Sequence, residues 1–242
     1  MAKTAIITGG AHGIGRECVK VFARAGYNVL INYNNSKADA QALASGLCAE
    51  GLSAAAYRAD VSKREEAVAM ASFCFEKFGS AEVLVNNAGL AQSKLFTDIT
   101  EADWEMICGV NLKGVFNCCQ AFLPHMIAKK HGRIINISSV WGITGASCEV
   151  HYSAAKAGVI GLTKALAKET APSGITVNCV APGVIDTRML GGFSADEIAA
   201  LTEEIPVGRL GTPNDVAQCV MFLANAGYVT GQVVGVDGGF AV

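Results

Sequence analysis

The sequence predicts an α/β protein, a doubly wound parallel sheet of about seven strands with helices on both faces. Short β-rich runs alternate with helical stretches of about a dozen residues along the whole chain. Several of these runs are apolar throughout, which is typical of strands covered on both faces. A glycine-rich turn follows the first run and opens a helix, as expected at the carboxyl edge of such a sheet.

The predicted strands are spaced so that a crossover helix fits between consecutive members, as a parallel sheet requires. They span residues 4–8, 28–33, 53–61, 82–89, 133–139, 175–183 and 232–239. Each is rich in Val, Ile, Ala or other apolar residues.

A single domain over residues 1–242 is predicted, because no linker, repeat or low-complexity tract divides the chain and 51% of it is hydrophobic. Residues 186–212 depart from the regular rhythm, with Gly191, Gly192, Pro206 and Gly211. This segment follows the carboxyl end of a strand, where ligands bind in such sheets, so we expect a lid over a substrate. An ordinary connecting helix is the alternative.

Charge and composition exclude several function classes. Lys and Arg number 19 against 21 Asp and Glu, so the chain lacks a basic footprint for nucleic acid or an anionic membrane. The nine cysteines are odd in number and contain no CxxC, which favours reduced thiols, and the four histidines are scattered, so no metal site is expected. The apolar run near the amino terminus is too short for a signal sequence or a membrane span, and we expect a cytoplasmic protein.

The stretch TAIITGGAHGIGRECVKVFARAG combines a strand, a glycine-rich turn and an amphipathic helix. Gly9, Gly13 and Gly15 permit a tight turn, backbone contact with a pyrophosphate and close packing of helix on strand. The spacing differs from G-x-G-x-x-G, but the strand before, the helix after, and Asp60 and Val61 closing the third strand support the same interpretation. A Rossmann-like, dinucleotide-binding fold is therefore predicted.

The end of the second strand indicates which nicotinamide cofactor is used. Enzymes that use NAD usually present a carboxylate to the ribose there, whereas this chain offers Asn32, Tyr33 and Asn34, with His12 nearby in the glycine turn. These donors suit a 2′-phosphate, so NADP(H) is favoured. In the alternative, Asn32 binds ribose hydroxyls and NAD(H) is used.

Several ordered motifs point to one family. They are TGGAHGIG, NNAG at 86–89, NLKG at 111–114, Ser139, YSAAK at 152–156 and APG at 181–183. Together they resemble the short-chain dehydrogenase/reductase family over essentially the whole chain. Tyr152, Lys156 and Ser139 match the family's catalytic pattern, and Asn111 matches its fourth member.

The resemblance implies roles that suit the chemistry of these side chains. Tyr152 would donate a proton to a ketone oxygen, which requires its pKa to fall from about 10 toward 7, worth roughly 4 kcal/mol. Lys156, one helical turn on, would help supply that field and bind the cofactor ribose, since one charge about 4 Å away is worth a similar amount. Ser139 would position the carbonyl. Asn111 would hold a water that relays protons to Lys156.

The same resemblance indicates further cofactor contacts along the carboxyl edge of the sheet. Asn86, Ala88 and Gly89 are expected to line the adenosine and ribose, together with Ile14 of the glycine turn. The nicotinamide would be flanked by Pro182, Gly183, Ile185 and Thr187.

The helix that carries YSAAK has a stripe of small residues, Ala154, Gly158, Gly161 and Ala165. Each glycine costs about 1 kcal/mol against alanine, so close approach of another backbone is expected to offset it. In the resembling family this helix commonly packs on its copy in a neighbouring subunit, which implies a dimer or tetramer. Packing against the protein's own sheet is the alternative.

For the substrate, IPVGRLGTPNDVA and the general layout resemble 3-oxoacyl-acyl carrier protein reductases. Lys129, Lys130 and Arg133 would serve an acidic carrier, although Ser173 stands where an arginine is frequent.

Other substrates stay open. LAQSKLFTDIT and SVWGITGASCEVHYSAAKAG are similar to elongation factor P 5-aminopentanone reductases, in which case Glu149 would attract a substrate amine. Hydroxysteroids or other small ketones, and a catalytically silent NADP-binding scaffold, are further alternatives. The expected pocket is bounded by Leu90, Gln92, Trp141, Thr144, Glu149 and the lid, and the family pattern needs no catalytic role for His151.

Overall fold

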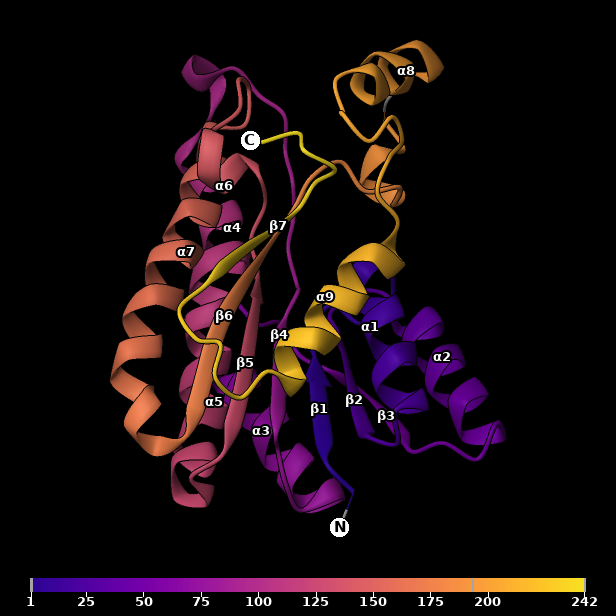
Figure 1. The fold of residues 1–242 in the computed structure, drawn as a ribbon, viewed down its shortest axis with the longest axis vertical. Coiled ribbons are helices and arrows are strands. Elements are labelled where there is room, and N and C mark those ends of the chain that lie inside the picture. Colours follow the sequence, from indigo (N-terminus) through magenta and orange to yellow (C-terminus); the bar gives the residue numbers. More distant parts are fainter. Residues whose placement is uncertain (1, 193, 242) are drawn as a thin grey trace.

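A computed structural model describes residues 2–192 and 194–241 of the chain (Figure 1). Seven parallel strands form one sheet in the order β3-β2-β1-β4-β5-β6-β7. The strands are β1 (Thr4–Ile7), β2 (Asn28–Tyr33), β3 (Ala54–Arg58), β4 (Val83–Asn86), β5 (Gly132–Ile137), β6 (Ile175–Pro182) and β7 (Val233–Val236). The predicted fold class is confirmed, with a strand overlapping every predicted run.

Helices cover both faces of the sheet. The α-helices are α1 (Gly13–Arg24), α2 (Lys37–Ala49), α3 (Arg64–Phe78), α4 (Glu101–Cys108), α5 (Gly114–Lys129), α6 (Trp141–Thr144), α7 (Val150–Thr170), α8 (Ala195–Glu203) and α9 (Pro213–Asn225). Short 3-10 turns are η1 (Phe96–Asp98), η3 (Ala171–Ser173) and η4 (Arg188–Leu190), and η2 (Gly109–Lys113) is a π-helical turn between α4 and α5.

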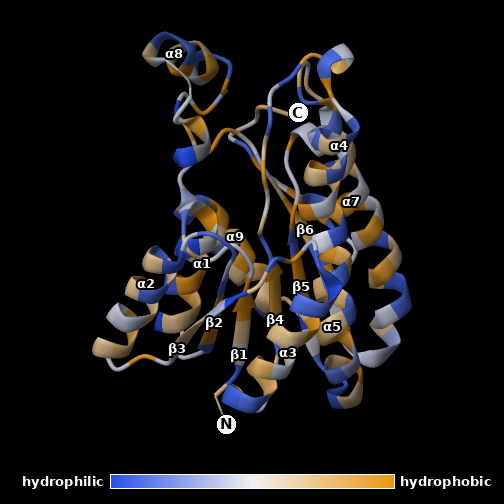
Figure 2. Ribbon diagram, turned by 180° about the vertical axis from the view of Figure 1, so that it is seen from behind, coloured by the Kyte–Doolittle hydropathy of each residue, from blue (hydrophilic) through white to orange (hydrophobic). Residues whose placement is uncertain are grey.

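Two hydrophobic clusters, one on each side of the sheet, hold these layers together. One joins α1, α2 and α9 to the sheet, and the other joins α3, α5 and α7 to its opposite face. All eight residues of β6 are buried, as the apolar runs of the sequence predict. Figure 2 shows that the strands form the hydrophobic centre of the fold and that the surrounding helices are amphipathic.

Most strands end earlier in the structure than the sequence predicts. The strands at 53–61, 82–89 and 232–239 stop at Arg58, Asn86 and Val236. The chain leaves the sheet at these points. Ala88, Gly89 and other predicted ligand contacts therefore lie in loops beyond the strand ends.

The predicted lid region contains η4 and α8, and α8 stands away from the body of the domain (Figure 1). The two ends of the predicted lid region are joined by an isolated β-bridge between Ile185 and Gly211. Asp186 N donates to Gly211 O over 2.8 Å. Ser194 caps α8 through a reciprocal pair of hydrogen bonds with Glu197. Phe193, within the predicted lid, lies outside the described residues.

The helical run Glu101–Lys129 passes a length and composition test for a membrane span, and 44% of its most apolar window is buried within the fold. Core helices of globular domains pass the same test. All nine cysteines lie in the described part of the chain and have free thiols.

Candidate active site

The glycine turn lies at the carboxyl edge of the sheet, beside the point where the strand order reverses between β1 and β4. Gly9 and Gly13 have positive φ values of 61° and 48°, which favour glycine. A Cβ atom on Gly15 would lie 2.3 Å from the carbonyl oxygen of Gly9 and 2.5 Å from Nδ2 of Asn87. The turn is therefore too close to its neighbours for a side chain at Gly15.

The turn is tied to the end of β4. Nδ2 of Asn87 donates to the carbonyl oxygens of Thr8 and Gly9 over 2.9 and 3.2 Å. Oγ1 of Thr8 accepts from the backbone N–H groups of Asn87 and Ala88. This glycine-rich loop, held to the end of β4 at the N-terminus of α1, fits the pyrophosphate of a dinucleotide, which needs close approach of backbone amides.

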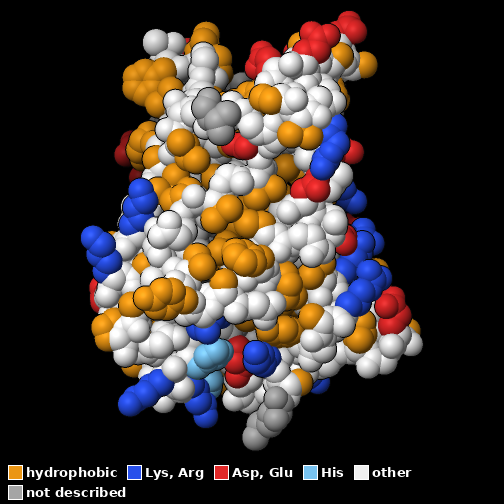
Figure 3. All heavy atoms as spheres, in the orientation of Figure 1, with side chains coloured by type: hydrophobic (Ala, Val, Ile, Leu, Met, Phe, Trp, Pro, Cys, Tyr) orange, Lys and Arg blue, Asp and Glu red, His pale blue; other side chains and the backbone are white. Residues whose placement is uncertain are grey.

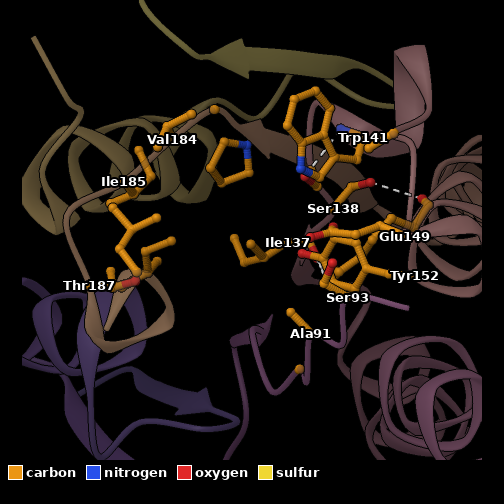
Figure 4. A pocket seen from close by; sticks show the side chains of 18 of the residues that line it. Ala91, Ser93, Ile137, Ser138, Trp141, Glu149, Tyr152, Val184, Ile185 and Thr187 are labelled. Carbon is orange, nitrogen blue, oxygen red and sulfur yellow. Dashed lines mark hydrogen bonds between the residues drawn. The ribbon is translucent and has the colours of Figure 1, made fainter. Parts of the chain in front are cut away.

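A cavity of about 380 Å³ opens next to this turn. Figure 4 shows Ser93, Glu149 and Tyr152 on one side of it and Val184, Ile185 and Thr187 on the other. The predicted residues that line it are Ile14, Gly89, Ser139, Tyr152, Lys156, Pro182, Gly183, Ile185 and Thr187. Three of the four predicted catalytic side chains thus reach one cavity of the size that ligand sites usually have.

Tyr152 is 8% exposed at the N-terminal end of α7. Burial raises the pKa of its phenol to about 12, and a hydrogen bond with Ser139 opposes the shift. The expectation of a pKa near 7 is therefore not met in this arrangement. A raised pKa keeps the phenol protonated at neutral pH, which is the form that donates a proton to a carbonyl oxygen.

Lys156 lies close to Tyr152 but does not supply the expected lowering, and burial of the phenol dominates. Its ammonium lies 5.6 Å from the centre of the Tyr152 ring and donates a hydrogen bond to the carbonyl oxygen of Ile137 over 2.9 Å. Burial lowers the pKa of Lys156 to about 8, so it is mainly charged at pH 7. Once the phenol has given up its proton, this cation is in place to stabilise the phenolate.

Asn111 is fully buried within the π-helical turn η2. Its Nδ2 donates to the carbonyl oxygens of Leu90 and Ile107, each over 2.9 Å, and its Oδ1 accepts from Leu90 N over 3.3 Å. A Cβ on Gly89 would lie 2.7 Å from that Oδ1. The amide thus joins the loop after β4 to the helix, and such π-turns are frequent at functional sites.

Ser139 follows β5 and is 7% exposed. Its Oγ accepts from the backbone N–H of Trp141 over 3.2 Å, so its own proton is free to point toward Tyr152 or a substrate oxygen. The neighbouring Ser138 donates to the carbonyl oxygen of Lys156 over 2.8 Å, which ties the end of β5 to α7. The structure thereby fixes the spacing between the two catalytic segments.

Other predicted cofactor residues lie outside the cavity or use their side chains within the protein. Asn32 is buried, with its amide donating to Ala59 O and its Oδ1 accepting from Gly9 N, so it supports the glycine turn. Nδ2 of Asn86 donates to Oδ1 of Asn136, its register partner on the neighbouring strand β5, over 2.8 Å. Tyr33 is 7% exposed and packs in the core.

Two further predicted residues act as supports in the neighbouring loop. Oδ1 of Asp60 accepts from the backbone N–H and the hydroxyl of Ser62. The carbonyl oxygen of Val61 accepts from Asn117 Nδ2 over 2.8 Å.

The predicted site near the second strand also contains charges that sequence reasoning missed. Nε2 of His12 lies 3.3 Å from Oδ2 of Asp39 and 3.2 Å from Nη1 of Arg188. Arg58 pairs in register with Tyr33 across β2 and β3, and its Nη2 donates to Asn34 Oδ1 over 3.1 Å. A strand register that places Arg58 beside Asn34 is a tertiary fact with no local signal in the sequence.

The expected substrate pocket is correct in part. Trp141 and Glu149 line the cavity, whereas Leu90, Gln92 and Thr144 are not among its lining residues. Ala91 and Ser93 take the place of their neighbours because alternate residues of this extended segment point in opposite directions. Ile137, Ala146, Ser147, Leu190 and Leu201 complete the wall.

Fold and site together define a dinucleotide-dependent oxidoreductase, with an acid, a supporting cation and a hydroxyl beside a pyrophosphate-binding turn. A bound nicotinamide would supply or accept the hydride. The residues that could hold the dinucleotide, because they line or adjoin the cavity, are those of the glycine turn, Gly89, Lys156 and the segment 182–187.

Comparisons with known proteins identify the family. A family model described as enoyl-(acyl carrier protein) reductase matches residues 9–241. The 3-oxoacyl-[acyl-carrier-protein] reductase FabG of Staphylococcus epidermidis is 44% identical over 99% of both chains. The FabG of Thermotoga maritima is 42% identical over 99% of this chain and 98% of its own. The 3-oxoacyl-[acyl-carrier-protein] reductase of Synechocystis is 41% identical over 100% of this chain and 98% of its own.

The chain therefore belongs to the short-chain dehydrogenase/reductase family, as its motifs predict. It is an oxidoreductase acting on CH–OH or C=O groups with a nicotinamide cofactor.

Proposed function

We propose that the protein is an NADPH-dependent ketoreductase that reduces 3-oxoacyl groups carried on a thioester. The observation that carries the proposal is the cavity in which Ser139, Tyr152 and Lys156 meet beside the glycine turn. Whole-chain similarity to 3-oxoacyl-[acyl-carrier-protein] reductases supports the substrate class. In this role Tyr152 protonates the 3-oxo oxygen, Ser139 positions it, and Lys156 stabilises the phenolate that remains.

NADP(H) is the favoured cofactor. The end of β2 presents Asn34 with Arg58 donating to it, and His12 lies in the adjoining turn. Cationic and amide donors of this kind suit a 2′-phosphate, whereas a ribose-binding carboxylate would repel it.

Steady-state oxidation of NADPH and NADH with acetoacetyl-CoA tests both parts of this proposal. We expect turnover with a kcat/KM for NADPH at least about tenfold above that for NADH, which corresponds to about 1.4 kcal/mol. Preference for NADH contradicts the cofactor assignment. Negligible turnover of acetoacetyl-CoA together with a broad ketone panel would instead favour the scaffold alternative.

Docking of a carrier to Lys129, Lys130 and Arg133 of the same chain is not supported. Lys129 ends α5 and Arg133 is the second residue of β5, at the amino end of the strand, whereas Ser139 follows its carboxyl end (Figure 1). A six-residue strand separates the two edges by roughly 20 Å. Nη1 of Arg133 donates to the carbonyl oxygens of Gly132 and Gly174, which is a structural role.

A second candidate substrate is a ketone that carries an amine, as in the elongation factor P 5-aminopentanone reductases. Glu149 favours it. This carboxyl group lines the cavity, and burial raises its pKa. In the described part of the chain its carboxylate has no hydrogen bond or ion pair, so a cationic substrate would supply the partner that a half-buried carboxylate requires.

The substitution Glu149→Gln separates the two candidates. If an ammonium group binds there, KM for 5-(dimethylamino)-2-pentanone, whose tertiary amine cannot cyclise onto the ketone, should rise about tenfold or more, because a charge-assisted bond is lost. KM for acetoacetyl-CoA should stay within about threefold or improve. Equal effects on both substrates would contradict an amine-binding role for Glu149.

A homo-oligomer is also proposed, and the stripe on α7 supports it in part. Gly158 packs within the chain, since a Cβ there would lie 2.8 Å from Leu112 Cδ2. Ala154, Gly161 and Ala165 are exposed, and a Cβ on Gly161 would meet nothing within 4 Å. Figure 3 adds hydrophobic side chains gathered over the face that carries β7 and α9, where Phe222 is 60% exposed.

Gly161→Leu should convert the oligomer to monomers if a second copy covers α7. Sedimentation velocity at micromolar concentration measures the outcome. Gly46→Leu, on the exposed face of α2 where a Cβ also meets nothing, is the matched control and should leave the oligomeric state unchanged. A monomeric wild type, or an oligomer that tolerates Gly161→Leu, contradicts this interface.

Two remaining expectations belong to the same proposal. The segment 186–212 acts as the lid, which Leu190 and Leu201 support by lining the cavity. The cytoplasm is the proposed location, in keeping with a carrier-borne or small soluble substrate.

A further inference from the structure

His151, in the first turn of α7, is fully buried next to Tyr152 in the chain. Its Nε2 lies 2.9 Å from Oε1 of Gln92, in the segment between β4 and η1. Its Nδ1 is buried without a hydrogen-bond partner among the described residues. A buried polar atom left unpaired costs free energy, so an apolar side chain would serve packing better here. The imidazole therefore calls for an explanation beyond packing.

A chain of hydrogen bonds fixes which nitrogen of this ring carries the hydrogen. Nζ of Lys94 donates to Oδ2 of Asp103 over 2.7 Å, and Nε2 of Gln92 donates to Oδ1 over 2.8 Å. The Lys94 ammonium and the neighbouring Thr100 hold the pKa of Asp103 well below its usual range, so this carboxylate remains an acceptor. The Gln92 amide therefore turns its oxygen toward the imidazole, and Nε2 of His151 must donate.

The bond between His151 and Gln92 anchors a wall of the cavity. Ala91 and Ser93, on either side of Gln92, both line the cavity, opposite Val184 in Figure 4. These short side chains face the substrate space while Gln92 turns the other way, toward α7.

Backbone contacts hold the same segment at its two ends. Leu90 is bonded through both its N–H and its carbonyl to the Asn111 amide. The N–H of Lys94 donates to the carbonyl oxygen of Cys148 over 2.7 Å, just before α7. The Gln92 contact lies between these attachments and ties the middle of the wall to the helix that carries Tyr152.

We propose that His151 is a positioning residue that sets substrate affinity, because its Nε2–H holds the Ala91–Ser93 wall at a fixed distance from the Tyr152 hydroxyl. The inference rests on the proposed function, since it takes this cavity as the substrate site. Without the bond the middle of the wall loses its attachment to α7 and keeps only the bond of Gln92 to Asp103 in α4, so a substrate is held less firmly against the acid. His151 itself touches no reacting atom.

A matched pair of substitutions tests the role. Glutamine places its amide nitrogen near the position of imidazole Nε2, whereas asparagine is too short and reaches only the position of Nδ1. His151→Gln should keep KM for acetoacetyl-CoA within about threefold of wild type, and His151→Asn should raise it about tenfold or more. In both variants kcat and the KM for NADPH should change by less than about threefold. Gln92→Leu should reproduce the His151→Asn defect without adding to it in the double variant.

Equal KM values in the two variants, or a loss confined to kcat, overturn the proposal. A two-bond ¹H–¹⁵N spectrum of histidine-labelled protein gives a readout that needs no substrate. It should show a hydrogen on Nε2 of His151, and a ring that carries its hydrogen on Nδ1 alone overturns the proposal as well. If the wild type fails to reduce acetoacetyl-CoA but reduces 5-(dimethylamino)-2-pentanone, the 3-oxoacyl assignment fails, and the same KM comparison with the amine-bearing ketone decides the role of His151.

Discussion

Tyr152→Phe should lower kcat for ketone reduction by about 10²–10⁴-fold, because it removes the proton donor and leaves the rest of the cavity in place. Phenylalanine keeps the contacts of the ring with Ile107 and Ala155. The lost hydroxyl has one hydrogen-bond partner in the structure, Ser139, so stability should change by only about 1 kcal/mol. Stopped-flow or steady-state NADPH oxidation measures the loss in rate.

Binding of the dinucleotide separates a chemical defect from a folding defect. The Kd of Tyr152→Phe for NADPH, read by fluorescence titration, should stay within about threefold of wild type. Tyr57→Phe is the matched control. Tyr57, in β3, stacks on Phe73 of α3 and does not line the cavity. A Tyr152→Phe enzyme with more than about a tenth of wild-type kcat would show that another group supplies the proton.

Gly15→Ala should abolish tight dinucleotide binding and destabilise the fold. The backbone at Gly15 has no positive φ, so alanine itself is not strained there. The added Cβ would instead lie 2.3 Å from Gly9 O and 2.5 Å from Asn87 Nδ2. Neither atom can move away without a loss of stability, because the Asn87 amide is hydrogen-bonded to the turn. We expect Kd for NADPH to rise about a hundredfold and the free energy of unfolding to fall by about 1–3 kcal/mol.

Denaturant unfolding and fluorescence titration check these two effects. Gly46→Ala in α2 is the control, because a Cβ there meets nothing within 4 Å. That variant should be more stable by about 0.5–1 kcal/mol through helix propensity, with unchanged NADPH affinity. If Gly15→Ala binds NADPH within threefold of wild type, the turn does not approach the pyrophosphate as proposed.

Local chemistry made it predictable that three of the proposed catalytic side chains would lie together. Tyr152 and Lys156 are one helical turn apart, and strand ends in a parallel sheet share one edge, so residues after several strands were expected to meet. Ser139, Tyr152 and Lys156 do line one cavity. The glycine turn was predictable for the same reason, since the positive φ values at Gly9 and Gly13 favour glycine.

The direction of buried polar side chains was not predictable. Asn86 and Asn32 stand at strand ends where cofactor contacts are expected, yet Asn86 bonds Asn136 and Asn32 bonds Ala59. Side chains alternate between the two faces of a strand, and the choice of partner depends on the neighbouring strand. The low pKa expected for Tyr152 failed for a related reason, because desolvation depends on burial and Lys156 bonds Ile137 O.

The sequence by itself determined the fold class, and it predicts the glycine turn and Tyr152 as the proposed acid, because strand periodicity, glycine conformation and helical spacing are local properties of the chain. Only the tertiary structure decided which polar groups face the cavity, which pKa values rise, and that Arg58 stands beside Asn34 and His151 beside Gln92. Those outcomes depend on contacts between segments far apart in the chain, whose distances and burial exist only after the sheet and its helices have packed.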